Sequence, residues 1–167
     1  MTRIMILDDE PNVYESLQRV FRCERPNWEI ETFDDPRMAL RRAQTSLFDV
    51  FISDFRMPLM TGVEFLSEVC NVQPEAIRII LSGQIDVGDL LGAINESRID
   101  RLVLKPADPV GIALTVDLAL DHREVLVENR RLANHLRSLQ AKHQLLAARE
   151  GEAVRLRPKL DEAQKNP

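Results

Sequence analysis

The chain of 167 residues has few of the features on which several protein classes depend. It has only two cysteines, Cys23 and Cys70, which stand alone in separate helix-like segments and belong to no metal-type cluster. No apolar run approaches the roughly 18–20 residues that a bilayer span needs. Asp8, Asp9 and Glu10 also interrupt the first apolar stretch, where a signal peptide would need its apolar region. We therefore expect a cytoplasmic protein rather than a secreted, membrane or disulfide-stabilised one.

The composition, 44% hydrophobic and 29% charged, is typical of a globular protein, but the charge is unevenly distributed. Residues 1–124 carry 13 Lys and Arg against 22 Asp and Glu, whereas residues 125–167 carry 9 against 5. The first segment thus has a net charge of −9 and the second of +4. An acidic domain does not suit binding to nucleic acid, so we expect no direct nucleic-acid contact. The charge change favours a domain boundary near residue 124.

Five short apolar runs alternate with segments of helical periodicity in residues 1–124. The runs predict strands at 3–7, 28–33, 50–53, 77–81 and 101–104. Helix-start signals agree with this division, since Asp35-Pro36 and Asp108-Pro109 each precede a helical segment. This alternation predicts an α/β fold, a doubly wound five-stranded parallel sheet covered by helices on both faces.

Chemically useful side chains follow four of the predicted strands, at the sheet edge where ligands bind in such folds. Asp8 and Asp9 follow the first strand, Asp54 the third, Ser82 the fourth and Lys105 the fifth. Clustered carboxylates repel unless a cation neutralises them, and oxygen ligands suit Mg²⁺. Each residue alone has an ordinary role in a helix cap, turn or strand exit. Together they favour Mg²⁺-dependent phosphoryl transfer to a carboxylate.

Four ordered motifs in residues 1–124 resemble the receiver domain of bacterial two-component response regulators. The motifs are MILDDEP at 5–11, ISDFRMP at 52–58 with Gly62, ILSG at 80–83, and LKP at 104–106. The resemblance implies a flavodoxin-like fold with strand order 2-1-3-4-5. Segments 84–96 and 98–101 are similar to receivers of hydrogenase-type transcription activators and of cyclic-dinucleotide phosphodiesterases.

The resemblance also implies roles for individual residues. Asp54 would accept a phosphoryl group from a phosphohistidine of a sensor histidine kinase. Mg²⁺ would be bound by Asp9, Asp54 and the backbone carbonyl of Arg56, with Asp8 acting through water. Lys105 would pair with Asp54 and then with the phosphate, and Ser82 would turn toward the phosphate on activation.

Three positions depart from this pattern or modify it. Receivers commonly have Tyr or Phe three residues before the lysine, whereas this chain has Leu102, which lacks the ring and the polar tip of the usual switch. Arg56 and Gln84 occupy the two positions that tune phosphate hydrolysis in the family. A long cationic side chain at Arg56 predicts a phosphoryl lifetime different from that of receivers with a small residue there.

The helical pattern that begins at Pro109 continues to about residue 150, a length typical of a coiled coil. One core position of the heptad holds Val125, Leu132, Leu139 and Leu146, and the other holds His122, Asn129, Leu136, His143 and Glu150. Leucine at one core position, with an asparagine at the other, is typical of parallel two-stranded coiled coils. We therefore predict a homodimer. We expect a coiled-coil stalk or linker at 125–153 and a disordered tail at 154–167. Alternatively, the leucines pack on the receiver or on an absent output domain.

Two other functions share part of this pattern. A phosphorylation-independent scaffold is compatible with Leu102, although Asp54, Ser82 and Lys105 are all present. A phosphohydrolase with an aspartyl-phosphate intermediate would share Mg²⁺ and the lysine, but such enzymes usually carry Asp-x-Asp after the first strand and a cap domain. We therefore expect a signalling switch rather than an enzyme that turns over a substrate.

Overall fold

The computed structural model describes the backbone of residues 1–83 and 99–163 and the side chains of residues 1–83 and 99–146. Its elements, in chain order, are β1 (Thr2–Leu7), α1 (Pro11–Glu24), β2 (Trp28–Phe33), α2 (Pro36–Thr45), β3 (Val50–Asp54), α3 (Gly62–Val72), β4 (Ile77–Ser82), β5 (Arg101–Leu104) and α5 (Pro109–Ala163). All strand pairs are parallel and the order is β2-β1-β3-β4-β5, as predicted. The helix expected near residues 87–94 lies outside the described residues.

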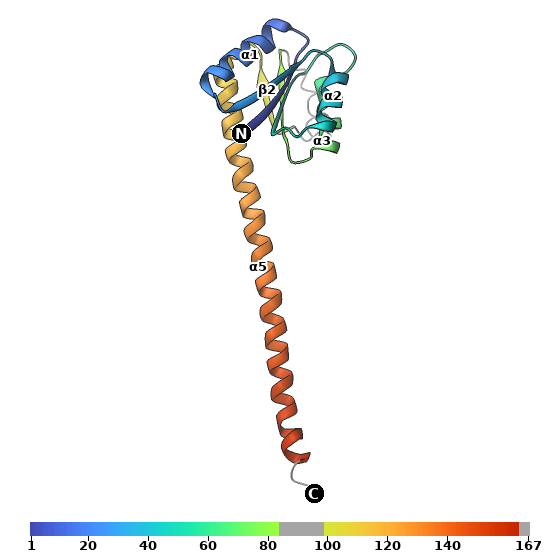
Figure 1. The fold of residues 1–167 in the computed structure, drawn as a ribbon, viewed down its shortest axis with the longest axis vertical. Helices are drawn as coiled ribbons and strands as arrows, with labels where there is room; N and C mark the ends of the chain where they lie inside the picture. Colours follow the sequence, from blue (N-terminus) through green and yellow to red (C-terminus); the bar gives the residue numbers. More distant parts are fainter. Residues whose placement is uncertain (84–98, 164–167) are drawn as a thin grey trace. The chain divides into compact units, whose positions relative to one another are not determined.

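Alternation along the strands produces two cores, one on each face of the sheet. Ile4 and Ile6 pack with residues of α1 and α5, whereas Met5 and Leu7 pack with residues of α2 and α3. Both faces are therefore apolar, and α1 lies on the opposite side of the sheet from α2 and α3 (Figure 1). Because helices cover both faces of the sheet, β3 and β4 are buried along their whole length.

Local hydrogen bonds fix where helices begin. The Asp35 carboxylate accepts from the backbone N–H of Arg37 at 2.8 Å and caps α2, as the Asp-Pro signal predicted. At α3, Thr61 and Glu64 form a reciprocal capping box. Gly62, which directly follows Thr61, lies beside the end of β3, where its N–H donates to the carbonyl of Phe55 at 3.0 Å.

The chain divides into two compact units, Met1–Arg123 and Glu124–Pro167. Helix α5 is continuous over 55 residues and supplies Ile112, Ala113, Val116 and Ala119 to the core of the first unit. Its backbone is helical to Ala163, whereas a disordered tail was expected from residue 154. Good helix formers such as Ala, Leu, Arg and Lys recur in this segment. In the part of the chain that the structure describes, no helix meets the length and apolarity that crossing a membrane demands.

Candidate functional site

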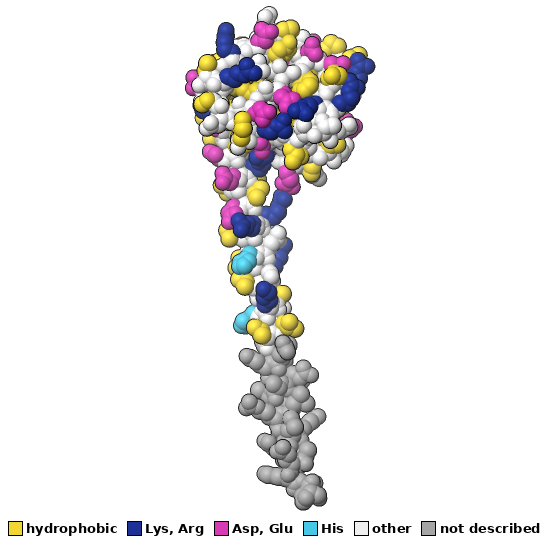
Figure 2. Space-filling view, in the orientation of Figure 1, with side chains coloured by type: hydrophobic (Ala, Val, Ile, Leu, Met, Phe, Trp, Pro, Cys, Tyr) yellow, Lys and Arg dark blue, Asp and Glu magenta, His cyan; other side chains and the backbone are white. Residues whose placement is uncertain are grey.

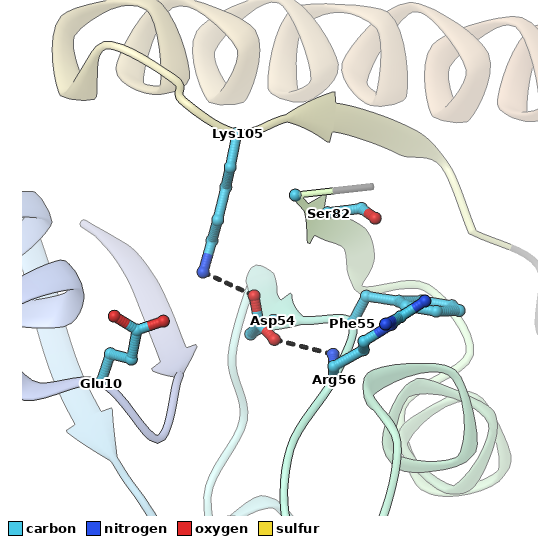
Figure 3. Close-up of a pocket in the computed structure, with 7 residues that line it drawn as sticks. Glu10, Asp54, Phe55, Arg56, Ser82 and Lys105 are labelled. Atoms are coloured by element: carbon cyan, nitrogen blue, oxygen red, sulfur yellow. Dashed lines mark hydrogen bonds and ion pairs between the residues drawn. The ribbon is translucent and has the colours of Figure 1, made fainter. Parts of the chain in front are cut away.

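Lys105 joins two carboxylates at the carboxyl edge of the sheet. Its ammonium lies 2.5 Å from Oδ1 of Asp54, the last residue of β3 (Figure 3). It also lies 2.9 Å from Oδ2 of Asp8, which follows β1. Lys105 itself directly follows β5, and its backbone N–H donates to the carbonyl of Ser82 at 2.7 Å. Three strand ends thus meet around one positive charge, as the topology predicted.

The remaining oxygens of both carboxylates are held by backbone N–H groups. Oδ2 of Asp54 accepts from the N–H of Arg56 at 2.7 Å, and Oδ1 of Asp8 accepts from the N–H of Glu10 at 2.9 Å. Asp8 is fully buried, and Asp54 is 8% exposed. Each side chain is therefore fixed from two sides, which restricts its rotation and aims the Asp54 carboxylate at the lysine.

Burial and pairing act on the charges in opposite directions. Burial raises the pKa of the Asp8 carboxyl above its ordinary value, and the bonds from Lys105 and from the N–H of Glu10 offset this only in part. For Lys105, burial alone would lower the pKa, but the hydrogen bonds and attraction of Asp54 and Asp8 outweigh burial and raise the pKa. The lysine therefore stays protonated across the physiological range.

A cavity of about 390 Å³ opens in front of the Asp54 carboxylate. Its lining residues are Glu10, Asp54, Phe55, Arg56, Ser82, Gly83 and Lys105. Glu10 lies across the cavity from Arg56 (Figure 3). No sequence pattern assigns Glu10 to the site, and its place directly after the two aspartates that follow β1 is the only signal that points to it.

Comparison with known proteins agrees with this geometry. Residues 4–117 match the response regulator receiver domain. The chain belongs to the response regulator receiver family. It is 34% identical over 135 residues to the hydrogenase transcriptional regulatory protein HoxA of Cupriavidus necator. The matched region covers 81% of this chain and 27% of HoxA. It is 29% identical over 157 residues to the C4-dicarboxylate transport transcriptional regulatory protein DctD of Pseudomonas aeruginosa, covering 93% of this chain and 33% of DctD.

The receiver spans about a quarter to a third of the length of these two relatives. Among solved structures, it is similar to the signal receiver domain of an HD domain-containing protein from Pseudomonas fluorescens Pf-5, with 28% identity and a TM-score of 0.66 over 76% of this chain and 92% of that one. A CheY-like receiver from Methanospirillum hungatei JF-1, at 22% identity and a TM-score of 0.69 over 74% and 97%, supports the fold. The predicted family and fold are thus confirmed.

The other predicted residues of the receiver occupy distinct environments. Ser82 ends β4 and is 1% exposed, and its hydroxyl is turned away from the Asp54 carboxylate (Figure 3). Leu102 is partly buried in β5 and packs on the core under α2 and α3. The side chain of Arg56 is exposed beside the cavity. Gln84, the second predicted tuning residue, lies outside the described residues.

The site offers carboxylate oxygens, the ligands that suit a hard cation such as Mg²⁺. Those of Asp8 and Asp54 both face the Lys105 ammonium. Asp9 follows Asp8 but is exposed. Within residues 1–83 and 99–146, no three acidic, His or Cys side chains gather closely enough to hold a metal ion. The structure therefore brings together two of the three predicted carboxylates, and the role of Asp9 as a ligand stays a prediction.

The predicted stalk residues all lie exposed on α5. Hydrophobic side chains recur on the surface of this helix (Figure 2). The large hydrophobic side chains at the predicted core positions are about half exposed: Val125, Leu132, Leu136, Leu139 and Leu146. Asn129 is exposed among them. A row of exposed leucines at heptad spacing fits an interface with another helix.

Proposed function

We propose that this receiver is a phosphorylation-dependent switch of a two-component system, in which Asp54 accepts a phosphoryl group from a sensor histidine kinase. The observation that supports it best is the bridge from the Lys105 ammonium to Asp54 and Asp8 in front of an open cavity. The bridge places a protonated lysine where negative charge would develop on a transferred phosphoryl group.

The proposed reaction joins an Asp54 oxygen to phosphorus. The carboxylate attacks the phosphorus of the phosphohistidine, the phosphorus–nitrogen bond breaks, and the imidazole leaves with its bonding electrons and takes up a proton. The product is an acyl phosphate on Asp54. Lys105 pairs with the new negative charge, and the N–H of Arg56, which already donates to Asp54 at 2.7 Å, remains available at the same carboxyl group.

Mg²⁺ would be held by Asp9, Asp54 and the backbone carbonyl of Arg56, with Asp8 acting through water, and would neutralise charge on the phosphoryl oxygens. This role rests on the family and on the carboxylate donors at the site. The pair of buried carboxylates supports it, because Asp8 and Asp54 carry two negative charges against the single positive charge of Lys105, and a second cation would neutralise the remainder.

The proposed output is a dimeric helical stalk built from the second unit. The half-exposed Val125, Leu132, Leu136, Leu139 and Leu146 would be covered by the same residues of a second copy, with Asn129 fixing the register. Phosphate contacts at Ser82 and Lys105 would shift a two-state receiver, with Leu102 in place of the usual aromatic switch, and the shift would reach the stalk along α5. Arg56 and Gln84 would tune the lifetime of the phosphoryl group.

Intact-mass spectrometry with light scattering tests this proposal on one set of samples. The full chain is incubated with acetyl phosphate and Mg²⁺, beside an EDTA-treated sample, an Asp54→Asn variant and an Asp34→Asn variant. Asp34 is an exposed aspartate that follows β2 and serves as the matched control. We expect one phosphoryl adduct on the wild type and on Asp34→Asn, and none on Asp54→Asn or with EDTA. An adduct that persists on Asp54→Asn would contradict Asp54 as the phosphoacceptor, and no adduct at all would favour the phosphorylation-independent scaffold.

A further inference from the structure

Gly62 packs against the backbone of Asp54. Gly62 is the first residue of α3 and is buried, and its N–H donates to the carbonyl of Phe55 at 3.0 Å. A Cβ atom at this position would overlap the carbonyl oxygen of Asp54 and would lie 2.8 Å from the hydroxyl oxygen of Ser53. Gly62 does not have a positive φ. Glycine is therefore required here by space rather than by backbone conformation.

Ser53 holds the same carbonyl group by a hydrogen bond. Its side chain is fully buried in β3, next to the apolar Ile52, and its hydroxyl donates to the carbonyl oxygen of Asp54 at 3.0 Å. A buried hydroxyl in an apolar strand is costly unless it is hydrogen-bonded. The Asp54 carbonyl thus has a hydroxyl donor and a side-chain-free glycine packed around it, both outside the cavity lining.

We propose that Ser53 and Gly62 are positioning residues that set the place of the phosphoacceptor by fixing its backbone. Lys105 and the N–H of Arg56 hold the carboxylate of Asp54, whereas Ser53 and Gly62 hold its main chain. Neither positioning residue is among the residues that line the cavity in front of the Asp54 carboxylate. Because a displacement of about 1 Å at a reacting atom can cost a hundredfold in rate, the backbone contact controls the reactivity of the carboxylate. This inference rests on the proposed function.

Two variants test the two contacts separately. Ser53→Ala removes only the hydroxyl that donates to Asp54, and Gly62→Ala adds the Cβ that would displace the Asp54 carbonyl. Gly111→Ala is the matched control for the glycine, because Gly111 also lies in the first turn of a helix and a Cβ there would meet no atom closer than 3.9 Å. Ser67→Ala, on the partly buried face of α3, is the control for the serine.

The rate of phosphorylation by acetyl phosphate is measured against donor concentration at saturating Mg²⁺, with thermal unfolding of each full-length variant. For Ser53→Ala we expect a maximal rate constant about tenfold lower, with the half-saturating donor concentration unchanged. For Gly62→Ala we expect a loss of about a hundredfold, and for both controls rates within twofold of the wild type.

The outcomes separate this inference from the proposed function. If the wild type acquires a phosphoryl group on Asp54 and Ser53→Ala reacts at the same maximal rate, the positioning role is wrong while the proposed function stands. If Gly62→Ala fails to fold, Ser53→Ala still decides, because it introduces no clash. A wild type without any adduct contradicts the proposed function itself. A lowered midpoint of unfolding with unchanged kinetics would show a structural role only and would overturn the inference.

Discussion

Arg123 and Asp49 are joined by two hydrogen bonds where the first unit ends. The guanidinium of Arg123 donates to the carbonyl oxygen of Asp49 at 3.2 Å and to its Oδ1 at 2.9 Å. The second carboxylate oxygen of Asp49 accepts from the backbone N–H of Arg3 at 2.9 Å. Asp49 thus connects α5 to β1 at the end of the sheet opposite Lys105.

Replacing the carboxylate of Asp49 should therefore cost more than replacing the guanidinium of Arg123. We expect Asp49→Ala to lower the free energy of unfolding by about 1–2 kcal/mol, because it leaves the Arg3 N–H without its carboxylate acceptor and removes one of the two hydrogen bonds of Arg123. Arg123→Ala should cost about 0.5 kcal/mol, since the pair is partly exposed. Urea unfolding followed by fluorescence of Trp28, the single tryptophan, measures both. Equal costs for the two variants would contradict the asymmetric role of Asp49.

The contribution of Lys105 to stability should be constant near neutral pH and decline only in alkali. Its pKa is raised above 10.5, so the stabilisation is fully present below that value and is lost as the pH rises through the folded-state pKa. We expect Lys105→Met to be less stable than the wild type by about 2 kcal/mol at both pH 7 and pH 9. Urea unfolding at these values and at pH 11 tests this. A difference that shrinks between pH 7 and 9 would be inconsistent with a raised pKa.

Glu31 should stabilise the edge of the sheet above, but not below, its titration range. Hydrogen bonds from Arg42 at 2.7 and 2.8 Å are the main cause of its lowered pKa, with a further bond from Arg3 at 2.8 Å. The stabilisation is present above the ordinary value of 4.5 and is lost as the pH falls through the lower folded-state pKa.

We expect Glu31→Gln to cost about 1 kcal/mol at pH 7 and to equal the wild type in stability at low pH. Glu29→Gln is the matched control on the same strand, since the Glu29 side chain is 46% exposed and makes one bond, to Arg3. Its cost should be a few tenths of a kcal/mol. If both variants lost the same free energy of unfolding at pH 7, the hydrogen bonds around Glu31 would not contribute the stability proposed here.

The proposed stalk is tested by two leucines that differ in heptad position. Leu139 lies at a core position of the predicted coil and Leu145 outside it, although both are exposed on α5. We expect Leu139→Lys to give a monomer, because two lysines would face each other in an apolar seam, and Leu145→Lys to leave the dimer intact. Multi-angle light scattering measures the mass. A monomeric wild type, or equal effects of the two substitutions, would rule out this seam.

Much of the fold could be predicted because periodicity determines which residues are buried. The runs that predicted β1, β3 and β4 are the strands that the structure buries on both faces, and the long helical pattern after Pro109 forms α5. The strand ends also placed Asp54 and Lys105 together, because parallel strands share an edge. Residue type and spacing were sufficient for these features.

Other contacts depend on register and packing that no sequence pattern determines. The sequence does not predict the ion pair of Asp8 with Lys105, since the family resemblance pairs the lysine with Asp54 alone. Gly62 was noted only as part of a motif, and its contact with the Asp54 carbonyl arises from the path of the loop into α3. Ser53 gives one signal, a hydroxyl that directly follows the apolar residues 50–52 in a buried strand. Such polar interruptions of a buried run are worth testing in other receivers.

The most direct test of the central claim is to locate the phosphoryl group. The full chain is treated with acetyl phosphate and Mg²⁺, reduced with borohydride to convert any acyl phosphate to an alcohol, digested, and sequenced by tandem mass spectrometry. We predict that residue 54 is converted to homoserine, that Asp8, Asp9 and Asp34 are unchanged, and that EDTA abolishes the conversion. Conversion of another carboxylate, or of none in the presence of Mg²⁺, would contradict the assignment of Asp54 as the phosphoacceptor.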